Sequence, residues 1–464
     1  MPEAPVPLPL PVPPRPARER SQLESFLVLR RNPLELWGRP AYERDILVGS
    51  FLGRRQVLLN DPDAIRHVLL DNHENYGRAP GTRRVLRPIL GEGLLLAEGE
   101  AWRHQRRTIA PALAPRTMPV LARHVAAASE EAEAALARAA ARPVDLGAEL
   151  RRLALTIAGR SMFSLEMERF GDRLRPLLLR FAERHATVGL SDLLLPASFP
   201  SPLDFGRRAF RAEWLAFIDR LIDARQAQPP PPEGGQRDLF DLLAAARDPE
   251  TGAGFGRAQL RDEVSTMILA GHETTAVALF WCLYLAGRMP EQQERLAAEA
   301  AAADLSPDGA AAAVLGSLPQ ARAHLDEALR LYPPAFLIVR EAIGPDTIAG
   351  MRLAPGTVVS VAPWVLHRHR RLWRNPDGFD PGRFLPGAPP PRRFAYMPFG
   401  AGPRICVGAR FALTEATLVL ARFLRAFRVE ILGRGEVVPV GRVTTQPDRT
   451  VRFLLTPRRP GGAG

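Results

Sequence analysis

The chain has 464 residues, of which 46% are hydrophobic and 24% are charged, and this composition excludes a largely disordered protein. The formal net charge is +12, and every one of the 62 positions counted as lysine or arginine is an arginine. The arginines are spread along the chain and no nucleic-acid-binding module is found, so the charge favours an acidic protein partner over nucleic acid.

The chain begins with a proline-rich leader, residues 1–34, and we expect residues 35–464 to form one domain. The leader lacks the positively charged start and continuous apolar core of a signal peptide. Its prolines also interrupt any helix that could span a bilayer, so we expect no membrane anchor. The two cysteines, Cys282 and Cys406, imply no disulfide framework, which suits a cytoplasmic location.

The predicted elements begin with short strands at 46–48 and 56–59 and a helix over 63–72. Helical periodicity follows over 121–141, 150–163, 174–188 and 205–226, and prolines and glycines at 229–235 predict an exposed linker. Strand patterns return between 344 and 363, a helix covers 409–427, and strands over 428–455 come last. The sequence therefore predicts a mainly α fold with small β elements at both ends.

The longest apolar helix pattern covers residues 261–288. It is long enough for a membrane span, but ionisable residues stand in its middle, where a bilayer makes them costly. A buried central helix therefore fits better, with Cys282 in the core. The Thr274 hydroxyl can bond the carbonyl of Ala270, four residues earlier, and bend the helix. For Glu273 and Thr274, a satisfied buried polar pair beside a helix kink is the alternative interpretation.

A glycine-bracketed loop near the C-terminus holds Cys406; it reads Phe399-Gly400-Ala401-Gly402-Pro403-Arg404-Ile405-Cys406-Val407-Gly408. The glycines let the backbone bend around the sulfur, and inward N–H groups with Arg404 would stabilise a thiolate. The loop suits a thiolate metal ligand, and a free, buried cysteine is the alternative. The pattern Phe-x-x-Gly-x-Arg-x-Cys-x-Gly resembles the haem-binding loop of the cytochrome P-450 family, with every fixed position filled.

Two further motifs resemble that family. The run Ala270-Gly271-His272-Glu273-Thr274-Thr275 resembles its oxygen-activation motif, which implies that Gly271 leaves room for a diatomic ligand, Thr274 holds hydrogen bonds and Glu273 delivers protons. Glu327-x-x-Arg330 resembles its structural Glu-x-x-Arg helix, with Arg383 as the third member of a triad. In this chain Gly382 replaces the glutamate that usually precedes that arginine, which puts one local contact in doubt.

The resemblance also assigns residues to haem binding. Trp102-x-x-x-Arg106 resembles the helix that holds a haem propionate, although a solvated cationic face is the alternative interpretation. The residues that the resemblance places around haem are Trp102, Arg106, Ala270, Gly271, Arg340, Phe399, Gly402, Arg404 and Gly408, with Cys406 as the axial thiolate.

The resemblance covers roughly residues 36–455 and implies a triangular-prism fold with a long central helix over haem b. It implies a monomeric haem-thiolate monooxygenase that uses O2 on a hydrophobic small molecule. Electrons would come from NAD(P)H through a reductase and a separate ferredoxin or flavodoxin-like donor. Fatty acids are the first substrate class considered, and terpenoids or other lipophiles are the alternative. A peroxide-driven peroxygenase and a non-catalytic haem sensor remain as other functions.

Overall fold

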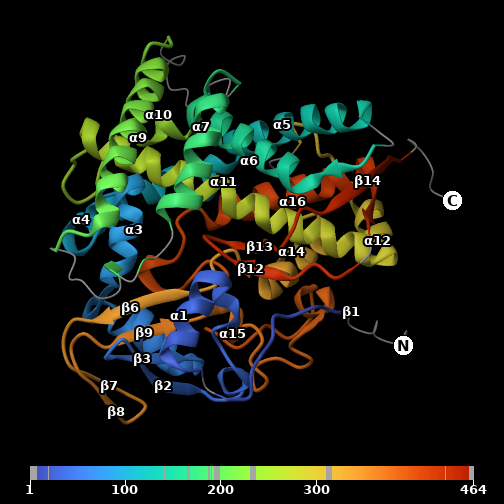
Figure 1. Ribbon diagram of the computed structural model, residues 1–464. Helices are drawn as coiled ribbons and strands as arrows, with labels where there is room; N and C mark the ends of the chain where they lie inside the picture. The colour runs from blue at the N-terminus through green and yellow to red at the C-terminus, as the bar shows by residue number, and fades with distance from the viewer. Residues whose placement is uncertain are drawn as a thin grey trace.

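The computed structural model describes residues 8–18, 20–139, 142–164, 168–186, 189, 191–192, 199–229, 237–309, 316–433 and 435–458. The linker expected at 229–235 lies outside these residues, except for residue 229. Figure 1 shows a large helical region above a smaller region that contains the main sheet. The predicted class, mainly α with small β elements, is confirmed.

The long helix α11 (Arg257–Arg288) crosses the centre of the molecule, with α6 (Leu146–Phe163) above it and α14 (Pro319–Leu331) below it in Figure 1. The helix α16 (Ala409–Ala426) follows the Cys406 loop and packs against both α11 and α5 (Met118–Arg138). The other α-helices are α1 (Gln22–Arg31), α2 (Pro62–Arg66), α3 (Pro80–Leu90), α4 (Gly99–Ile109), α7 (Glu168–Arg180), α9 (Pro202–Gln226), α10 (Leu239–Ala245), α12 (Pro290–Ala301) and α15 (Pro363–Leu366).

The helix α11 belongs to the core. It begins four residues before the predicted start, and it is the one helix of the described chain that is long and apolar enough to cross a membrane. Its most apolar window is 72% buried inside the protein. Trp281, Cys282 and Leu283 on this helix are fully buried. The prediction of a buried central helix, with Cys282 in the core, is confirmed.

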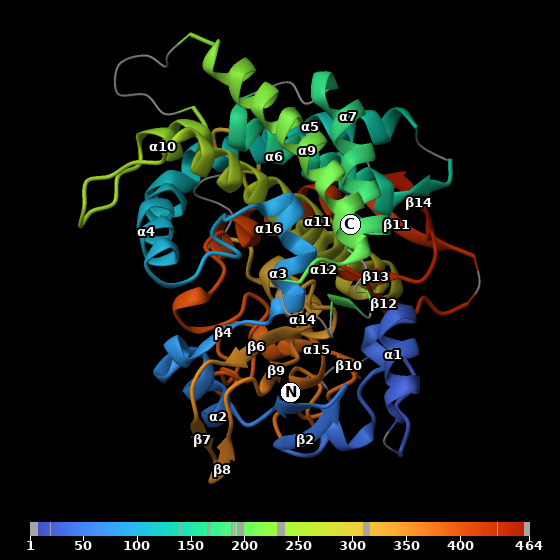
Figure 2. The same ribbon diagram turned by 60° about the vertical axis from the view of Figure 1, so that its left-hand side comes forward.

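The main sheet has the strand order β2-β3-β9-β6-β4. Its strands are β2 (Ile46–Phe51), β3 (Arg54–Leu59), β9 (Val358–Val361), β6 (Ile338–Ala342) and β4 (Tyr76–Arg78), and only β3 and β9 pair in parallel. The register places Arg78 of β4 opposite Arg340 of β6. This pairing brings two segments more than 250 residues apart to one edge of the sheet, below α3 and α4 (Figure 2).

Smaller sheets complete the fold. One contains β11 (Phe427–Leu432), β14 (Arg452–Pro457) and β5 (Val144–Asp145). The others are the pairs β12 (Pro439–Gly441) with β13 (Thr445–Pro447), β7 (Asp346–Ile348) with β8 (Met351–Leu353), and β1 (Leu8–Pro9) with β10 (Gly378–Phe379).

The described part of the leader is fastened to the rest of the protein. Strand β1 pairs with β10, and the Arg15 guanidinium lies 2.6 Å from the Asp377 carboxylate and 3.9 Å from the ring centre of Tyr42. Further along, the Asn32 side chain bonds the backbone of Pro439 and Gly441 in β12. The segment expected as a leader, 1–34, is therefore packed against the domain expected at 35–464 wherever the structure describes it.

Element boundaries differ from the predicted ones where helices change pitch. The helix predicted over 63–72 is α2 followed by a π-helical turn, His67–Asp71. Likewise, of the helix predicted over 174–188, the described residues 174–186 contain the end of α7 followed by a π-helical turn, Phe181–His185, and the last two residues lie outside the described chain. A π-turn keeps helical side-chain spacing for a few residues, so periodicity alone does not separate it from an α-helix.

Candidate active site

The Cys406 loop is shaped by two glycines with positive φ, Gly400 (φ 77°) and Gly402 (φ 72°). A Cβ on Gly402 would lie 1.8 Å from the carbonyl oxygen of Leu69, so only glycine fits there. The loop closes through a hydrogen bond from the Cys406 N–H to the Phe399 carbonyl, 2.9 Å. The predicted glycine-dependent bend is therefore present, and it leaves the cysteine at the start of α16.

Burial and two neighbouring groups act on the Cys406 thiol in opposite directions, and its pKa is raised overall. The residue keeps an exposed side, but the protein atoms around the thiol still make desolvation the largest influence on it, and that raises its pKa. The Gly408 N–H, through a hydrogen bond, and the Arg106 guanidinium, through its charge, lower that pKa. Arg106 also donates to the Ile405 carbonyl at 2.8 Å, so it lies directly beside the loop.

Three arginines gather around a single carboxylate. Arg404 ion-pairs with Glu98 and donates to the Ala97 carbonyl at 3.0 Å, while the backbone N–H of Arg78 donates to Glu98 at 3.0 Å. Desolvation, followed by the neighbouring guanidiniums, lowers the pKa of Arg78 to about 9 and that of Arg340 to about 10.

Trp102 completes this cluster. The Cζ atom of the Arg404 guanidinium lies 4.5 Å from the centre of the Trp102 ring, and the Trp102 side chain is buried. Trp102, Arg106, Arg340 and Arg404 are thus brought together near the Cys406 loop. Sequence reasoning missed Arg78 and Glu98. Arg78 lies in a strand of three residues, which is too short to show a periodic pattern in the sequence. The pairing of β4 with β6, which places Arg78 beside Arg340, cannot be read from the local sequence.

The middle of α11 contains the predicted hydrogen bond between Thr274 and Ala270, within an α-helix that is continuous over Arg257–Arg288. The Thr274 hydroxyl donates to the Ala270 carbonyl at 2.6 Å, as the four-residue spacing indicates. Ala270 is exposed although α11 is a core helix, so this part of the helix borders an open space. Gly271 is placed differently from the expectation. A Cβ there would meet the Met162 side chain of α6 at 3.2 Å, so the missing side chain allows close packing of α11 on α6.

The Glu273 carboxyl is largely buried and accepts a hydrogen bond from the Gln446 amide at 2.8 Å. Burial raises its pKa, which the charge of Arg151 and the bond from Gln446 lower in part. His272, to which sequence reasoning gave no role, is buried and has its pKa lowered to about 4 by desolvation and then by Arg151. Its imidazole is therefore neutral at pH 7.

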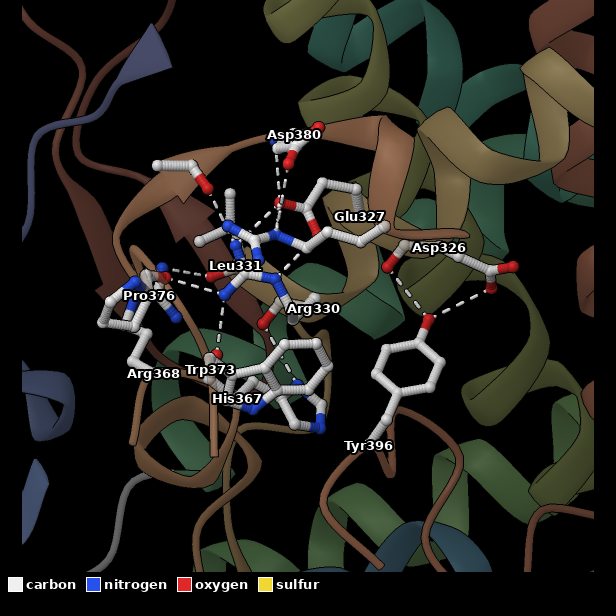
Figure 3. A network of polar contacts seen from close by, with 12 residues as sticks. Asp326, Glu327, Arg330, Leu331, His367, Arg368, Trp373, Pro376, Asp380 and Tyr396 are labelled. Carbon is white, nitrogen blue, oxygen red and sulfur yellow. Dashed lines mark hydrogen bonds and ion pairs between the residues drawn. The ribbon is translucent and has the colours of Figure 1, made fainter. Parts of the chain in front are cut away.

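The Glu327–Arg330 pair is fully buried, and Figure 3 shows the network around it. Both guanidinium contacts to the carboxylate measure 2.7 Å. Arg330 also donates to the carbonyls of His367, Pro376 and Gly378 at 2.7–2.9 Å. One pair thus holds three backbone groups of the segment 367–378.

Arg383, the third member of the expected triad, has its Nε 3.4 Å from a Glu327 oxygen. Without the usual glutamate, the Gly382 N–H donates to Asp380 at 3.0 Å, and the Asp380 N–H donates to Glu327 at 2.8 Å. The triad therefore forms around Gly382, with Asp380 next to it.

His367 connects this network to the cysteine loop. Its Nε2 accepts the Met397 N–H at 2.9 Å, and its Nδ1 donates to the Arg330 carbonyl at 3.1 Å. Desolvation and the Arg330 charge lower its pKa to about 3, so the ring stays neutral and keeps both bonds. Met397 stands two residues before Phe399. The triad thereby fixes the backbone on which the Cys406 loop begins.

The residues present fit haem. A single cysteine thiolate suits one axial position of the iron. Within the described residues, three guanidiniums share one carboxylate, so two positive charges have no carboxylate of their own, although Arg340 donates to the Val339 carbonyl at 3.0 Å. Haem b carries two propionates. The Nε of Arg78 is buried and has no hydrogen-bond partner. A cysteine in a glycine-shaped loop, a cluster with more guanidiniums than carboxylates and a central helix that borders open space at Ala270 define a haem-thiolate protein.

Comparison with known proteins agrees with this assignment. The cytochrome P450 family model matches residues 44–451. Cyclooctatin synthase of Streptomyces melanosporofaciens is 33% identical, with 93% of this chain and 92% of that protein covered. Cyclooctat-9-en-7-ol 5-monooxygenase of the same organism is 29% identical (87% and 86%), and cytokinin hydroxylase of Arabidopsis thaliana is 28% identical (87% and 79%).

The chain belongs to the cytochrome P450 family. It is a haem-dependent monooxygenase that uses O2, and its fold is that of the family. When bound, the haem iron with its thiolate ligand supplies the activation of dioxygen.

Proposed function

We propose that this monooxygenase inserts one oxygen atom of O2 into a hydrophobic, uncharged organic molecule by hydroxylation or epoxidation. Two electrons from NAD(P)H, carried by a separate ferredoxin or flavodoxin-like protein and its reductase, and two protons convert the other oxygen atom to water. The observation that carries this proposal is the presence in one fold of the Cys406 loop and the Thr274–Ala270 hydrogen bond of α11.

The proposed roles follow from the contacts around the site. Cys406 ligates the iron, and Gly408 and Arg106 stabilise its thiolate. Trp102, Arg340 and Arg404 hold the propionates, and we add Arg78 to them. Phe399, Gly402 and Ala270 shape the space around the haem, Gly271 lets α11 pack closely on α6, and the triad Glu327, Arg330 and Arg383 supports the loop.

Thr274 and Glu273 handle protons in this proposal. The Thr274 hydroxyl is fixed by its hydrogen bond to the Ala270 carbonyl, and its oxygen lone pairs would accept a hydrogen bond from water in the site. Burial raises the pKa of Glu273, which favours its protonated form, and in this proposal Glu273 takes up a proton and releases it toward the site.

An uncharged lipophile fits better than a fatty acid. A fatty acid would need a cation for its carboxylate, and Arg84 of α3 is already engaged by Asp204 at 3.1 Å and by Asp192 at 3.8 Å. Among the relatives, one monooxygenase acts by its name on cyclooctat-9-en-7-ol, an alcohol, which supports the neutral class. Fatty acids are the competing class.

The electron donor docks on the Cys406 side in this proposal. Ile405, the residue before Cys406, is 40% exposed. Two cations lie close to it: Arg106 donates to the Ile405 carbonyl, and Arg410 follows Cys406 by four residues in the sequence. An acidic donor would be attracted to this face by charge. Turnover with such a donor is expected to fall as ionic strength rises.

The test is reconstitution with NADPH, a ferredoxin, its reductase and a panel of neutral lipophiles and fatty acids. We expect oxygenated product from a neutral lipophile. Thr274→Ala should keep NADPH oxidation but divert more of it to hydrogen peroxide. If the fraction of NADPH oxidation that yields product is the same in Thr274→Ala as in the wild type, Thr274 does not have the proposed role. Product formed with hydrogen peroxide but never with the donor would identify a peroxygenase, and gas binding without any turnover would identify a sensor.

A further inference from the structure

The Glu273 carboxyl has a neutral partner in place of a cation. One oxygen, Oε1, accepts from the Gln446 amide, and the other, Oε2, lies 3.8 Å from Nε2 of His272, which is uncharged at pH 7. Within the described chain, no arginine comes within ion-pair distance of it. Arg151 of α6 acts on the carboxyl only through longer-range charge.

The segment that carries Gln446 is held firmly. Thr445, the preceding residue, donates through its hydroxyl to the Pro333 carbonyl at 2.6 Å. Its own carbonyl accepts from the Trp281 indole on α11 at 2.7 Å. These two bonds fix β13 against the helix that carries Glu273.

The partner strand is fastened as well. Gln446 pairs with Val440 of β12, and Asn32 bonds the backbone on both sides of that residue, at Pro439 (3.1 Å) and Gly441 (2.9 Å). The amide of Gln446 is thus a preorganised donor on a rigid hairpin.

We propose that Gln446 is a positioning residue: it fixes Glu273 by one oxygen and, being neutral, leaves the other oxygen free to carry a proton for delivery to the site. This inference rests on the proposed function. In the delivery step, the O–H bond of the Glu273 carboxyl breaks, and the proton joins the acceptor oxygen in the site. The resulting carboxylate regains a proton from water, and no electrons move.

The charge of the residue at position 446 should then control the protonation of Glu273. The groups that face this carboxyl are His272 of α11, Arg151 of α6 and Gln446 of β13. Gln446→Lys adds a cation and stabilises the carboxylate, so the carboxyl should lose its proton at lower pH, by about one unit or more. Gln446→Leu removes a hydrogen bond that favours the carboxylate, so the proton should be kept to higher pH.

The decisive experiment titrates Glu273 itself. The infrared band of the protonated carboxyl is followed against pH in the full-length holoenzyme, with Glu273→Gln subtracted to isolate this group. We expect the midpoints to fall in the order Gln446→Leu, wild type, Gln446→Lys, from high pH to low. General loosening of the hairpin would shift both variants in one direction. Equal midpoints, a shared direction, or no titrating band assigned to Glu273 overturns the proposal.

A second readout follows function. The fraction of NADPH oxidation that yields product should decline with rising pH at midpoints in the same order. If the infrared midpoints follow the expected order but the wild type shows no turnover, the positioning role of Gln446 is supported, and the monooxygenase proposal is overturned for the chosen donor and substrates. Turnover whose pH profile is the same in all three proteins would overturn the role of Gln446 alone.

Discussion

Replacing Arg330 by methionine tests how the triad supports the cysteine loop. The substitution keeps an unbranched apolar stem but removes the guanidinium, with its charge and every donor. Arg330 makes five hydrogen bonds, two to Glu327 and three to backbone carbonyls, and neither member of the pair is exposed (Figure 3). All of these acceptors lose their donor at once.

The expected cost follows from these contacts. Removing one partner of a buried ion pair typically costs about 3–5 kcal/mol, because the other charge stays buried. Each buried carbonyl left without a donor adds about 1–3 kcal/mol. The Asp380 N–H and Arg383 still reach Glu327 and offset part of this cost. The total is comparable to the roughly 5–15 kcal/mol that stabilises a whole domain, so Arg330→Met should be largely unfolded or unable to hold haem.

Chemical denaturation followed by tryptophan fluorescence, together with haem content per protein, measures the effect. Arg322→Met on the same helix is the matched control. Arg322 pairs with Asp326 at 2.7 Å but is itself one-third exposed, and the buried Asp326 keeps the hydrogen bond from Tyr396 at 3.0 Å, so the loss of Arg322 should cost much less than the loss of Arg330. Arg330→Lys keeps the charge but not the fork of donors, so it should fall between the two. If Arg330→Met and Arg322→Met lose equally little stability and haem, the buried network does not support the loop.

Two further predictions concern buried charge. Glu263 is fully buried, accepts the Leu94 N–H, and has its pKa raised from 4.5 to about 8 by burial. The unfolded chain releases this proton first, so the carboxyl makes folding stability fall between about pH 4.5 and 8. Glu263→Gln should flatten that decline in denaturation midpoints, and an unchanged slope would contradict this. Arg78→Leu should speed haem transfer to apomyoglobin about tenfold, a change of ~1.4 kcal/mol, because the buried Nε of Arg78 has no hydrogen-bond partner in the protein. Arg83→Leu is the control and should not change the rate, because the exposed Arg83 guanidinium pairs with Glu92. Equal transfer rates in the two variants would show that Arg78 does not bind haem.

Local spacing predicted the parts of the site that lie within one element. Thr274 and Ala270 are four residues apart on a helix, so their hydrogen bond follows from helical geometry alone. Glu327 and Arg330 are three apart and face each other for the same reason. The bend at Cys406 followed from glycines whose positive φ other residues rarely adopt.

Contacts between distant segments could not be predicted in this way. Arg78 joins the cationic cluster because β4 pairs with β6, and this register depends on the whole sheet. Gln446 reaches Glu273 from 173 residues away, through a hairpin fixed by the leader and by α11. Gly271 was expected to make room for a ligand, but only the packing of α6 shows which way its missing side chain would point.

The central claim is that the Cys406 sulfur ligates haem iron. The carbon monoxide difference spectrum of the reduced protein tests it most directly, because the Soret band of a thiolate-ligated haem lies at a longer wavelength than that of a histidine-ligated one. Wild type and Cys282→Ala, in which only the buried core cysteine is replaced, should both show the long-wavelength band, and Cys406→Ala should lack it. The same band in Cys406→Ala, or no such band in the wild type, would contradict the claim.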